Sequence, residues 1–410
     1  MKVICDRGAL MDAVNLVAAV VPARSPTPAL SCVKLTARKV GAAGELTLSG
    51  TDAETSLHVT LTQVDVQRAG EVAIPADKLR AIVSAEDNEP TLTIEVDGAA
   101  SEQCHIRGTN AHFRVFAYPA KDFPPMPDFV GAINGSGPDA AKSVFSHTAG
   151  GLMDLVSRTV FATARETSRY AINGVLMKRD GKKLEMVATD GRRLAVSRSQ
   201  IAGGKGAAGS GGESITCIVP TKALNILTKL ARDPDETVRV AISDSRIFFA
   251  FETTLSGGGK DPDKHPAPRA ILSSTLVEGS FPPYEDVIPK DQDKRITAMR
   301  DDLGAAVRKA SVLTNEESRG VRMAFSSKDK RLTLSSRAPE MGESEISIEL
   351  SDYQGDDIEI SFNPSFITDV LRVVPQQQII VELKAPNKPG LIRSETNDFL
   401  YVVMPVNLPG

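Results

Sequence analysis

Side chains that could carry acid–base, nucleophilic or metal chemistry are scattered along this chain of 410 residues. The sequence has five histidines, at His58, His105, His112, His147 and His265. They form no H-E-x-x-H or H-x-H pattern, which is what a histidine metal site on one helix or strand would need. Cys104 and His105 are adjacent, so in a strand their side chains point to opposite faces. We therefore predict no catalytic residue and no metal ligand among them.

Two further patterns could bind phosphate or a divalent cation. Ser256-Gly257-Gly258-Gly259-Lys260 is rich in glycine, but it lacks the G-x-x-x-x-G-K-[ST] spacing and the strand–loop–helix context of a phosphate loop. The pairs Asp301-Asp302 and Asp356-Asp357 could ligate a cation, yet acidic pairs at helix starts and in loops usually act as caps or solvated faces. We expect no cofactor, and nothing here predicts an enzyme.

Composition is that of an ordinary globular protein, with 41% hydrophobic and 24% charged residues. No apolar run is long enough for a signal peptide or a membrane span. Cys5, Cys32, Cys104 and Cys217 show no C-x-x-C spacing, so we expect reduced, mostly buried thiols in a cytoplasmic protein. The net charge of −4 disfavours nucleic-acid binding only if charge is spread evenly, because a basic stripe can lie on an acidic body.

One phrase of sequence occurs three times at nearly equal intervals. It runs from the end of a strand through a proline into an apolar helix, around Pro75, Pro220 and Pro364. Proline suits the first helical turn, where its missing N–H would have no partner in any case. In the middle copy, Leu224, Leu227 and Leu230 recur every three residues and predict one buried face. Three equally spaced copies indicate one structural unit used three times.

Each unit reads as a helix, three strands, the proline helix and then two or three strands. The opening helices are expected at 10–21, 152–164 and 303–313. Two helices on one face of an antiparallel sheet make a two-layer α+β domain. We therefore predict an α+β protein of three repeated domains, at residues 1–127, 128–284 and 285–410. Glycine-rich insertions at 203–212 and 255–268 are expected to be mobile loops.

Several motifs together resemble one protein family over essentially the whole chain. The most specific are a hairpin with Thr-Asp-Gly-x-Arg-Leu and a Tyr-Val-Val-Met-Pro tail. The motifs are Tyr170–Gly174, Val187–Val196, Phe281–Tyr284, Leu313–Glu316 and Tyr401–Val406. In this order they resemble the bacterial DNA polymerase III beta subunit, the replicative sliding clamp. The two insertions and the end of the tail look longer than is usual in that family.

The resemblance implies a ring formed by two chains, head to tail, with six similar domains around duplex DNA. Such a ring serves as a processivity factor and holds DNA topologically, so sequence-independent, exchangeable phosphate contacts suffice. It implies as partners duplex DNA, the alpha subunit of the replicative polymerase, the clamp loader, and other polymerases and repair proteins.

Dimer and DNA contacts are implied by the same resemblance. The dimer contact would join the first domain around Phe113 and Val115 to the partner's third domain around Val312 and Leu313. The DNA contacts would include Arg24, Lys78 and Lys222. Lys222 lies two residues after its proline and Lys78 lies three residues after its proline. At these two positions the third proline helix has Phe366 and Ile367, so the three copies are not equivalent in charge.

A peptide-binding pocket is also implied, in which partners insert a short motif with a Gln and a Leu-Phe-like end. Four distant segments supply most of its residues, as expected of a pocket at a domain boundary. The matching positions are Ile172, Thr189, Gly191, Arg193, Leu194, Pro282, Val287, Asn363, Phe366, Val403, Met404, Pro405 and Val406. We expect Gly191 to allow close backbone approach, Leu194, Val287 and Val403 to form apolar walls, Met404 to repack for different ligands, and the charge of Arg193 to stay in water.

Three points stay open from the sequence. Asp286 stands where some family members carry Arg, which changes the rim of the pocket. The apolar pocket positions, taken singly, also fit simple core packing. As alternatives to the clamp, a non-catalytic repeat scaffold without DNA and a DNA-processing enzyme remain.

Overall fold

A computed structural model of the protein describes residues 1–40, 43–97, 103–164, 170–201, 214–252, 268–314, 320–338 and 342–407. The predicted loop at 203–212, the stretch Ser256–Lys260, His265, Asn315 and Glu316 lie outside these residues, as does the predicted loop at 255–268 except Pro268. The chain divides into two compact units. The first is Met1–Met153 with Ile201–Gly211 and Lys222–Leu276, and the second is Asp154–Gln200 with Gly212–Thr221 and Val277–Gly410.

The first unit contains an antiparallel sheet and helices packed on it. Its strands are β1 (Lys2–Asp6), β2 (Cys32–Val40), β3 (Ala43–Thr51), β4 (Thr55–Arg68), β5 (Gly70–Pro75), β6 (Thr91–Val96), β7 (Gln103–Arg107), β8 (His112–Phe116), β9 (Ser143–Thr148), β14 (Thr237–Ile242), β15 (Arg246–Phe251) and β16 (Ala270–Thr275). Its helices are α1 (Arg7–Ala18), α2 (Ala76–Ala85) and α3 (Phe129–Ile133). Helix α4 (Ala149–Ser157) belongs to this unit up to Met153, and α5 (Thr221–Leu230) belongs to it from Lys222 onward.

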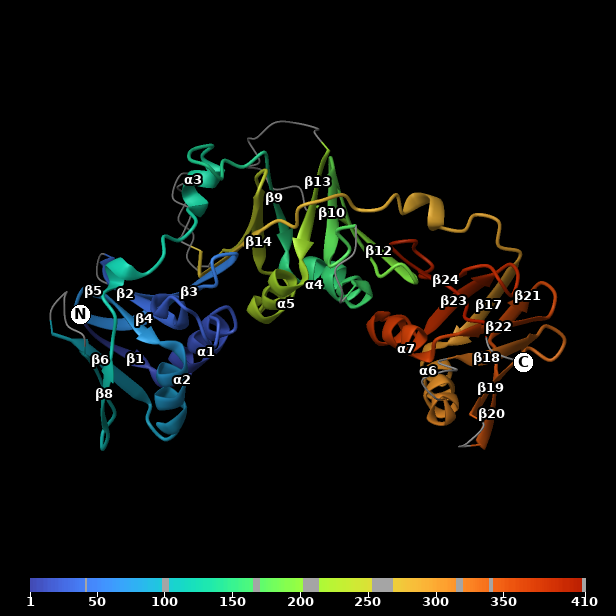
Figure 1. Cartoon of the computed structure of the whole chain (residues 1–410), viewed down its shortest axis with the longest axis horizontal. Helices are drawn as coiled ribbons and strands as arrows, with labels where there is room; N and C mark the ends of the chain where they lie inside the picture. The colour runs from blue at the N-terminus through green and yellow to red at the C-terminus, as the bar shows by residue number, and fades with distance from the viewer. Residues whose placement is uncertain are drawn as a thin grey trace. The chain divides into compact units, whose positions relative to one another are not determined.

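Helix α1 shows how local sequence sets these elements. Asp6 caps it, because its carboxylate accepts a hydrogen bond from the backbone N–H of Ala9 at 2.7 Å. Leu10, Val14 and Val17 recur at helical spacing and are fully buried. That face lies on β3 and β4, beside α2 (Figure 1). The observed helix begins three residues before the predicted 10–21 because the acidic cap precedes its apolar stripe.

The sheet of the first unit crosses a boundary that the sequence predicted between domains. Its main path is β8-β7-β6-β1-β4-β16-β15-β14-β9, with β2, β3 and β5 joined at its side. Strand β16 belongs to the predicted range 128–284, yet it pairs antiparallel with β4 from 1–127, with Ala270 opposite Val59. Backbone hydrogen bonds therefore tie the last strand of the predicted second domain to the first domain.

The second unit contains two sheets. Its strands are β10 (Gly174–Asp180), β11 (Lys183–Thr189), β12 (Arg193–Gln200), β13 (Ile215–Pro220), β17 (Lys294–Met299), β18 (Val321–Ser326), β19 (Arg331–Ala338), β20 (Gly342–Glu349), β21 (Asp352–Gln354), β22 (Ile358–Phe362), β23 (Gln378–Leu383), β24 (Gly390–Arg393) and β25 (Phe399–Val403). Its helices are α6 (Arg300–Ala310) and α7 (Pro364–Val373).

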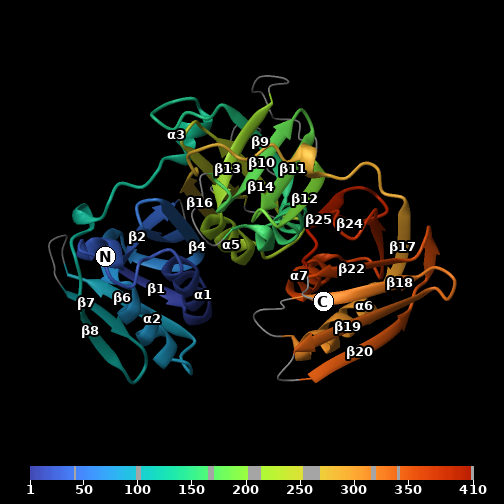
Figure 2. The same cartoon turned by 45° about the vertical axis from the view of Figure 1, so that its right-hand side comes forward.

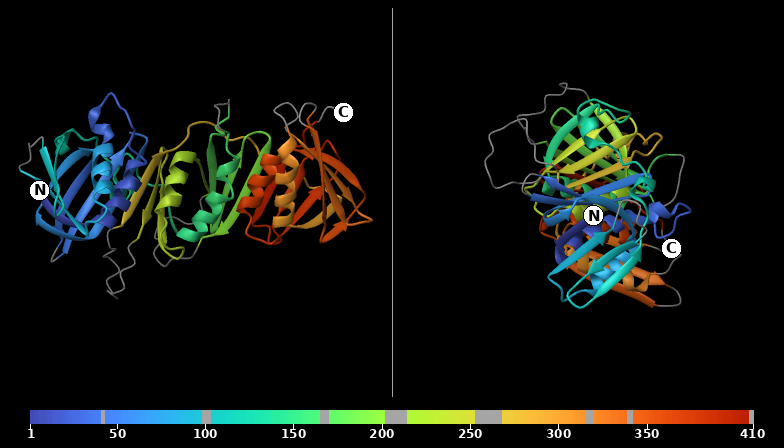
Figure 3. Two further views of the ribbon diagram at one scale, coloured as in Figure 1. Left: turned by 90° about the horizontal axis from the view of Figure 1, so that it is seen from below. Right: turned by 90° about the vertical axis from the view of Figure 1, so that its left-hand side faces the viewer.

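Pairing across a predicted boundary recurs in the second unit. One sheet has the order β13-β10-β11-β12-β25-β24-β23-β17-β21, and the other has the order β20-β19-β18-β22. Strand β25, near the end of the chain, pairs with β12, with Tyr401 opposite Ala195. Helices α6 and α7 pack side by side, and α6 lies on β19 and β20 (Figures 2 and 3).

The α+β class with antiparallel sheets is confirmed, while the role of the prolines differs in part. Proline occupies the first helical position only in α7, at Pro364. Pro75 is the residue before α2, and Pro220 is the last residue of β13 before α5. Each proline still marks the point where a strand ends and a helix begins, because it cannot continue the ladder of strand hydrogen bonds.

The expectation of buried, reduced cysteines is confirmed. Cys5, Cys32, Cys104 and Cys217 are buried and unpaired. Burial raises the pKa of the Cys5, Cys104 and Cys217 thiols to about 12 and that of Cys32 to about 11, so they stay protonated at neutral pH. In the described part of the chain, no helix is long and apolar enough to cross a membrane.

The two acidic pairs lie at a helix start and in a loop. Asp301 and Asp302 lie in the first turn of α6, where carboxylates favour the helix dipole. Asp357 accepts a hydrogen bond from the backbone N–H of Ser327 at 2.7 Å. Among the described residues, no three His, Cys, Asp or Glu side chains gather closely enough to hold a metal ion.

His58 on β4 predicts a pH dependence of stability. Burial, and then the charge of Lys34, lowers its pKa from 6.5 to about 4, and its Nδ1 lies 2.8 Å from Ser49 Oγ. Since the unfolded chain binds this proton more tightly, stability is complete above pH 6.5 and falls as the pH drops toward 4. Between pH 7 and pH 5, the wild type should lose about 2 kcal/mol that a His58→Asn variant does not lose. Urea unfolding of both proteins at both pH values measures this difference, and equal losses would contradict it.

Candidate functional site

The hairpin between β11 and β12 is the centre of the candidate site, and its turn is fixed by two side chains. Thr189 Oγ1 accepts from the N–H of Gly191 at 3.1 Å and donates to the carbonyl of Arg193 at 2.6 Å. Asp190 Oδ1 accepts from the N–H groups of Arg192 and Arg193 at 3.0 and 3.1 Å. Three backbone N–H groups and one carbonyl of the turn therefore have hydrogen-bond partners within the turn itself. These bonds hold the turn in one conformation.

Gly191 serves this turn by its backbone conformation, and its expected role in close backbone approach stays a prediction. Its φ is +83°, in the left-handed region that side chains rarely adopt. A Cβ at this position would meet nothing within 4 Å. Within the chain, glycine is therefore favoured at this position by its dihedral angle.

The same turn occurs in the first unit, at Thr51-Asp52. Thr51 Oγ1 accepts from the N–H of Ala53 at 3.0 Å and donates to the carbonyl of Thr55 at 3.0 Å. Asp52 Oδ1 accepts from the N–H groups of Glu54 and Thr55 at 3.0 and 2.6 Å. Ala53 stands where the other copy has glycine and adopts a φ of +81°. The repeated sequence Thr-Asp thus gives the same hydrogen-bond pattern twice.

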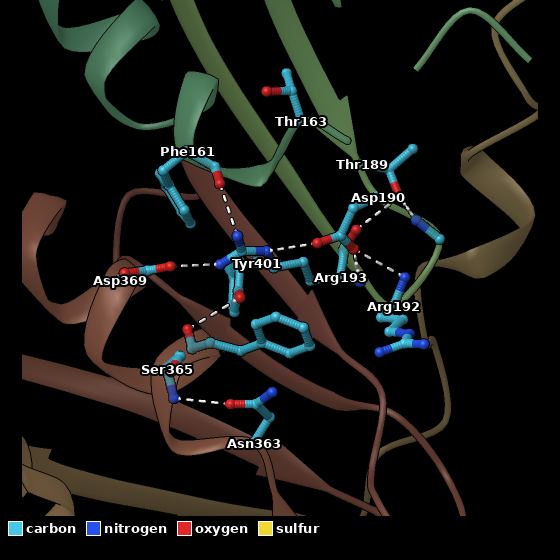
Figure 4. A network of polar contacts seen from close by, with 12 residues as sticks. Phe161, Thr163, Thr189, Asp190, Arg192, Arg193, Asn363, Ser365, Asp369 and Tyr401 are labelled. Carbon is cyan, nitrogen blue, oxygen red and sulfur yellow. Dashed lines mark hydrogen bonds and ion pairs between the residues drawn. The ribbon is translucent and has the colours of Figure 1, made fainter. Parts of the chain in front are cut away.

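Arg193 lies at the centre of a polar network (Figure 4). Its Nε donates to Asp190 Oδ2 at 3.0 Å, its Nη1 to Asp369 Oδ2 at 2.8 Å, and its Nη2 to the carbonyl of Phe161 at 2.7 Å. Only 10% of its side chain is exposed, so the expectation that its charge stays in water is wrong. Burial alone would lower the pKa of the guanidinium, but the bond to Asp369, the neighbouring Tyr401 hydroxyl and the charge of Asp190 hold that pKa above its ordinary value.

Phe366, in the first turns of α7, is held at its ring and at its backbone. The guanidinium carbon of Arg193 lies 4.5 Å from the centre of the Phe366 ring, within cation–π range. The hydroxyl of Tyr401 donates to the carbonyl of Phe366 at 3.0 Å. Asn363 caps the helix, because its Oδ1 accepts from the N–H of Ser365 at 2.9 Å. The ring itself is half-buried.

The C-terminal tail runs beside this network. Val403 ends β25 opposite Arg193, and the N–H of Met404 donates to the carbonyl of Arg192 at 2.9 Å. Two residues on, the N–H of Val406 donates to the carbonyl of Ser361 at 2.9 Å. These bonds fix the tail while leaving 38% of Met404 exposed.

The remaining predicted pocket residues separate into buried and exposed groups. Ile172, Thr189, Leu194 and Val403 are less than 9% exposed, and Leu194 packs in a core cluster with Val196 and Val402. Core packing, the alternative reading, therefore accounts for Leu194 and Val403. Val287 is 47% exposed and Asp286 is exposed. Pro282, Pro405 and Val406 are partly exposed.

The sequence reading missed Phe161, Asp190, Asp369 and Tyr401 as parts of this site. Asp190 stood inside the quoted Thr-Asp-Gly motif, so its type and place were a usable signal. Asp369 had one too, since it lies three residues after Phe366 and therefore on the same face of the helix. The carbonyl of Phe161 contributes a backbone atom, which no side-chain pattern reveals.

The three basic residues proposed for DNA have different surroundings in the first unit. Arg24 is exposed in a bend after α1. Lys78, in the first turn of α2, is exposed and lies 3.2 Å from Asp77. Lys222, in the first turn of α5, contacts Asp52 Oδ2 and donates to the carbonyl of Val20 at 3.3 Å. The cation of Lys222 is therefore already partly neutralised by a carboxylate.

The four residues proposed for the dimer contact lie on or beside two edge strands. Phe113 and Val115 lie on β8, the edge strand of the sheet in the first unit. Phe116, on the same strand, is 75% exposed. Val312 and Leu313 form a 3₁₀ turn after α6 that contacts β20, the edge of the four-stranded sheet. Val312 is 70% exposed.

Comparison with known families finds three consecutive matches along the chain. The model of the DNA polymerase III beta subunit N-terminal domain matches residues 1–127. The central-domain model of the same family matches residues 149–257, and the C-terminal-domain model matches residues 285–407.

Individual relatives match over their full length. The beta sliding clamp of Pseudomonas aeruginosa is 31% identical over 98% of this chain and 99% of that relative. The beta sliding clamp of Escherichia coli K12 is 28% identical over 100% of each chain. The crystal structure of a DnaN sliding clamp from Pseudomonas aeruginosa bound to griselimycin superposes with a TM-score of 0.84 at 30% identity, covering 100% of both chains. A sliding clamp structure from Bacillus subtilis, also at 0.84 but 23% identical, agrees in fold.

Proposed function

This chain belongs to the DNA polymerase III beta subunit family of sliding clamps, and from that premise we propose that two copies close head to tail into a ring around duplex DNA. The protein has the three-domain clamp fold and serves DNA replication as the processivity clamp of DNA polymerase III. The ranges 1–127, 128–284 and 285–410 remain our proposal for the three domains.

The observation that supports ring closure most directly is a pair of complementary sheet edges. Strand β8 exposes His112 and Arg114, whereas β20 exposes Glu343, Glu345 and Glu349. The cation of Arg114 on the edge of one chain and the glutamates on the edge of its partner favour a head-to-tail contact and disfavour contact between two glutamate edges. Closure would also cover unpaired strand edges, which otherwise invite aggregation.

Arg24, Lys78 and Lys222 are proposed to face the DNA. Lys and Arg contacts with phosphates are independent of sequence and exchange readily, so they allow sliding. The bond from Lys222 to Asp52 supports a weak contact, because DNA must compete with a carboxylate for that cation. A ring that binds topologically gains from such weakness, since a tight contact would stop it from sliding.

The residues around Arg193 and Met404 are proposed to bind a short peptide of partner proteins. Exposed Met404 and Val287 and the half-buried ring of Phe366 offer apolar surface, while backbone bonds hold the segments that carry them. Methionine repacks easily, which suits a site that accepts several partners. The proposed partners are the polymerase alpha subunit, the clamp loader, and other polymerases and repair proteins. We further propose that the clamp works without catalysis, in the cytoplasm.

The ring itself predicts a dimer that depends on the exposed turn after α6. Light scattering should give twice the 43.7 kDa of one chain. Val312→Asp places a charge in the proposed contact and should shift the protein to monomer. The free energy needed to remove water from the unpaired carboxylate would exceed the free energy gained from the apolar contact. Val130→Asp, at another exposed valine, is the matched control and should stay dimeric. A monomeric wild type at micromolar concentration would refute the ring.

The DNA contacts predict a charge effect on loaded clamps. Wild-type clamp should remain on a nicked circular plasmid and leave it after linearisation. Lys78→Glu with Lys222→Glu should reduce loading and flatten its salt dependence, because fewer counterions are released. Asp52→Asn keeps the Oδ1 acceptor of the turn but frees Lys222, so it should increase retention. Lys182→Glu with Lys290→Glu changes net charge equally on exposed lysines and serves as the control. Equal loading of both pairs would show that Lys78 and Lys222 do not contact DNA.

The peptide site predicts a loss of binding from one side chain. Met404→Asp should abolish binding of a synthetic peptide carrying Gln-x-x-Leu-Phe, as should truncation after Val403, while the dimer stays intact. Met299→Asp is the matched control, since Met299 is exposed to 36% against 38% for Met404. Fluorescence anisotropy measures the affinity, and unchanged binding in both Met404→Asp and the truncated chain would place the groove elsewhere.

A further inference from the structure

We propose that Asp369 and Tyr401 are positioning residues of the peptide site, which hold Phe366 in its binding orientation before a peptide arrives. This inference rests on the proposed function of the site. Neither residue needs to touch the peptide. Asp369 acts through Arg193, and Tyr401 acts through the backbone of Phe366.

The first step is the constraint on Arg193. The three nitrogens of its guanidinium donate to three groups from three segments, namely Asp190 in the hairpin turn, Asp369 on α7 and the carbonyl of Phe161. A planar fork with three fixed acceptors has one orientation. Of these acceptors, only Asp369 lies on the helix that carries Phe366, so the bond of 2.8 Å between Nη1 and Oδ2 ties the cation to that helix.

The second step connects this fixed cation with the aromatic ring. The guanidinium carbon lies 4.5 Å from the centre of the Phe366 ring and 5.4 Å from that of Phe161. A cation over an aromatic face is attracted more strongly when the cation is shielded from water, and only 10% of the Arg193 side chain is exposed. Rotation of the Phe366 ring away from Arg193 would lose this attraction. Arg193 therefore favours one rotamer of Phe366.

The third step fixes the backbone below the ring. The Tyr401 hydroxyl donates to the carbonyl of Phe366, and the Tyr401 side chain is fully buried. Tyr401 lies on β25, three residues before the exposed Met404. The same strand thus leads into one wall of the site and holds the other. A wall ordered in advance costs a peptide less conformational entropy on binding.

An independent ion pair of the same unit provides a matched control. Arg158 Nη1 lies 2.9 Å from Asp398 Oδ2, and its side chain is 10% exposed, as for Arg193. Asp398 accepts hydrogen bonds from Ser394 and Thr396, and among the described residues no hydrogen bond or ion pair joins Arg158 or Asp398 directly to Phe366. Asp398→Asn therefore removes a comparable charge and should leave the orientation of Phe366 unchanged.

The test compares four variants of the full-length clamp with the synthetic Gln-x-x-Leu-Phe peptide. Asp369→Asn should weaken peptide affinity about 10-fold and Tyr401→Phe about 3-fold, through loss of a charged and a neutral hydrogen bond. Asp398→Asn should change it less than about 2-fold. In a Phe366→Leu background, Asp369→Asn should have almost no further effect, because the ring it positions is gone.

The outcomes separate this inference from the proposed function. If the wild type does not bind the peptide, the proposed function fails. If the wild type binds but Asp369→Asn and Asp398→Asn weaken binding equally, the aspartate acts only through general stability and the positioning role fails. An undiminished effect of Asp369→Asn in the Phe366→Leu background would also overturn it. Dimer mass and urea unfolding of every variant show whether the fold is intact, and Tyr401→Phe tests the role independently if Asp369→Asn unfolds.

Discussion

Strand pairing between consecutive thirds of the chain is the constraint on which both units depend. Strand β16 pairs with β4 in one unit, and β25 pairs with β12 in the other. Because ladder hydrogen bonds fix register, each pairing also fixes where the neighbouring loops lie. The register of β12 and β25 puts Arg193 opposite Val403, and Arg193 lies beside the tail for that reason.

The repeated Thr-Asp turn makes a similar connection in both units with the charges exchanged. In the first unit the turn supplies the carboxylate, Asp52, and the proline helix α5 supplies the cation, Lys222. In the second unit the turn supplies the cation, Arg193, and the proline helix α7 supplies the carboxylate, Asp369. The exchange fits the two roles that we propose for these residues. A lysine at the end of a flexible stem can exchange one partner for another, whereas a buried arginine with three acceptors is held in place.

Much of the fold could be predicted from the sequence, because the signals were local. Apolar periodicity placed α5, and the prolines marked where strands meet helices. The extent of the helices was less predictable, since Asp6 begins α1 before its apolar stripe. The resemblance to the clamp family identified the fold and the function. Pairing of β16 with β4 was not predictable, because it depends on the register of segments about 200 residues apart in the chain.

Within the candidate site the sequence alone determined the turn, whose Thr-Asp-Gly order supplies two hydrogen-bonding side chains and one residue free to adopt positive φ. Tertiary structure decided the state of Arg193. By sequence it was a hairpin arginine expected in water, and folding brings Asp190, Asp369 and the carbonyl of Phe161 around it. Burying a charge is costly unless several partners meet it in the right geometry. Those partners come from three segments, so only the folded chain can assemble them.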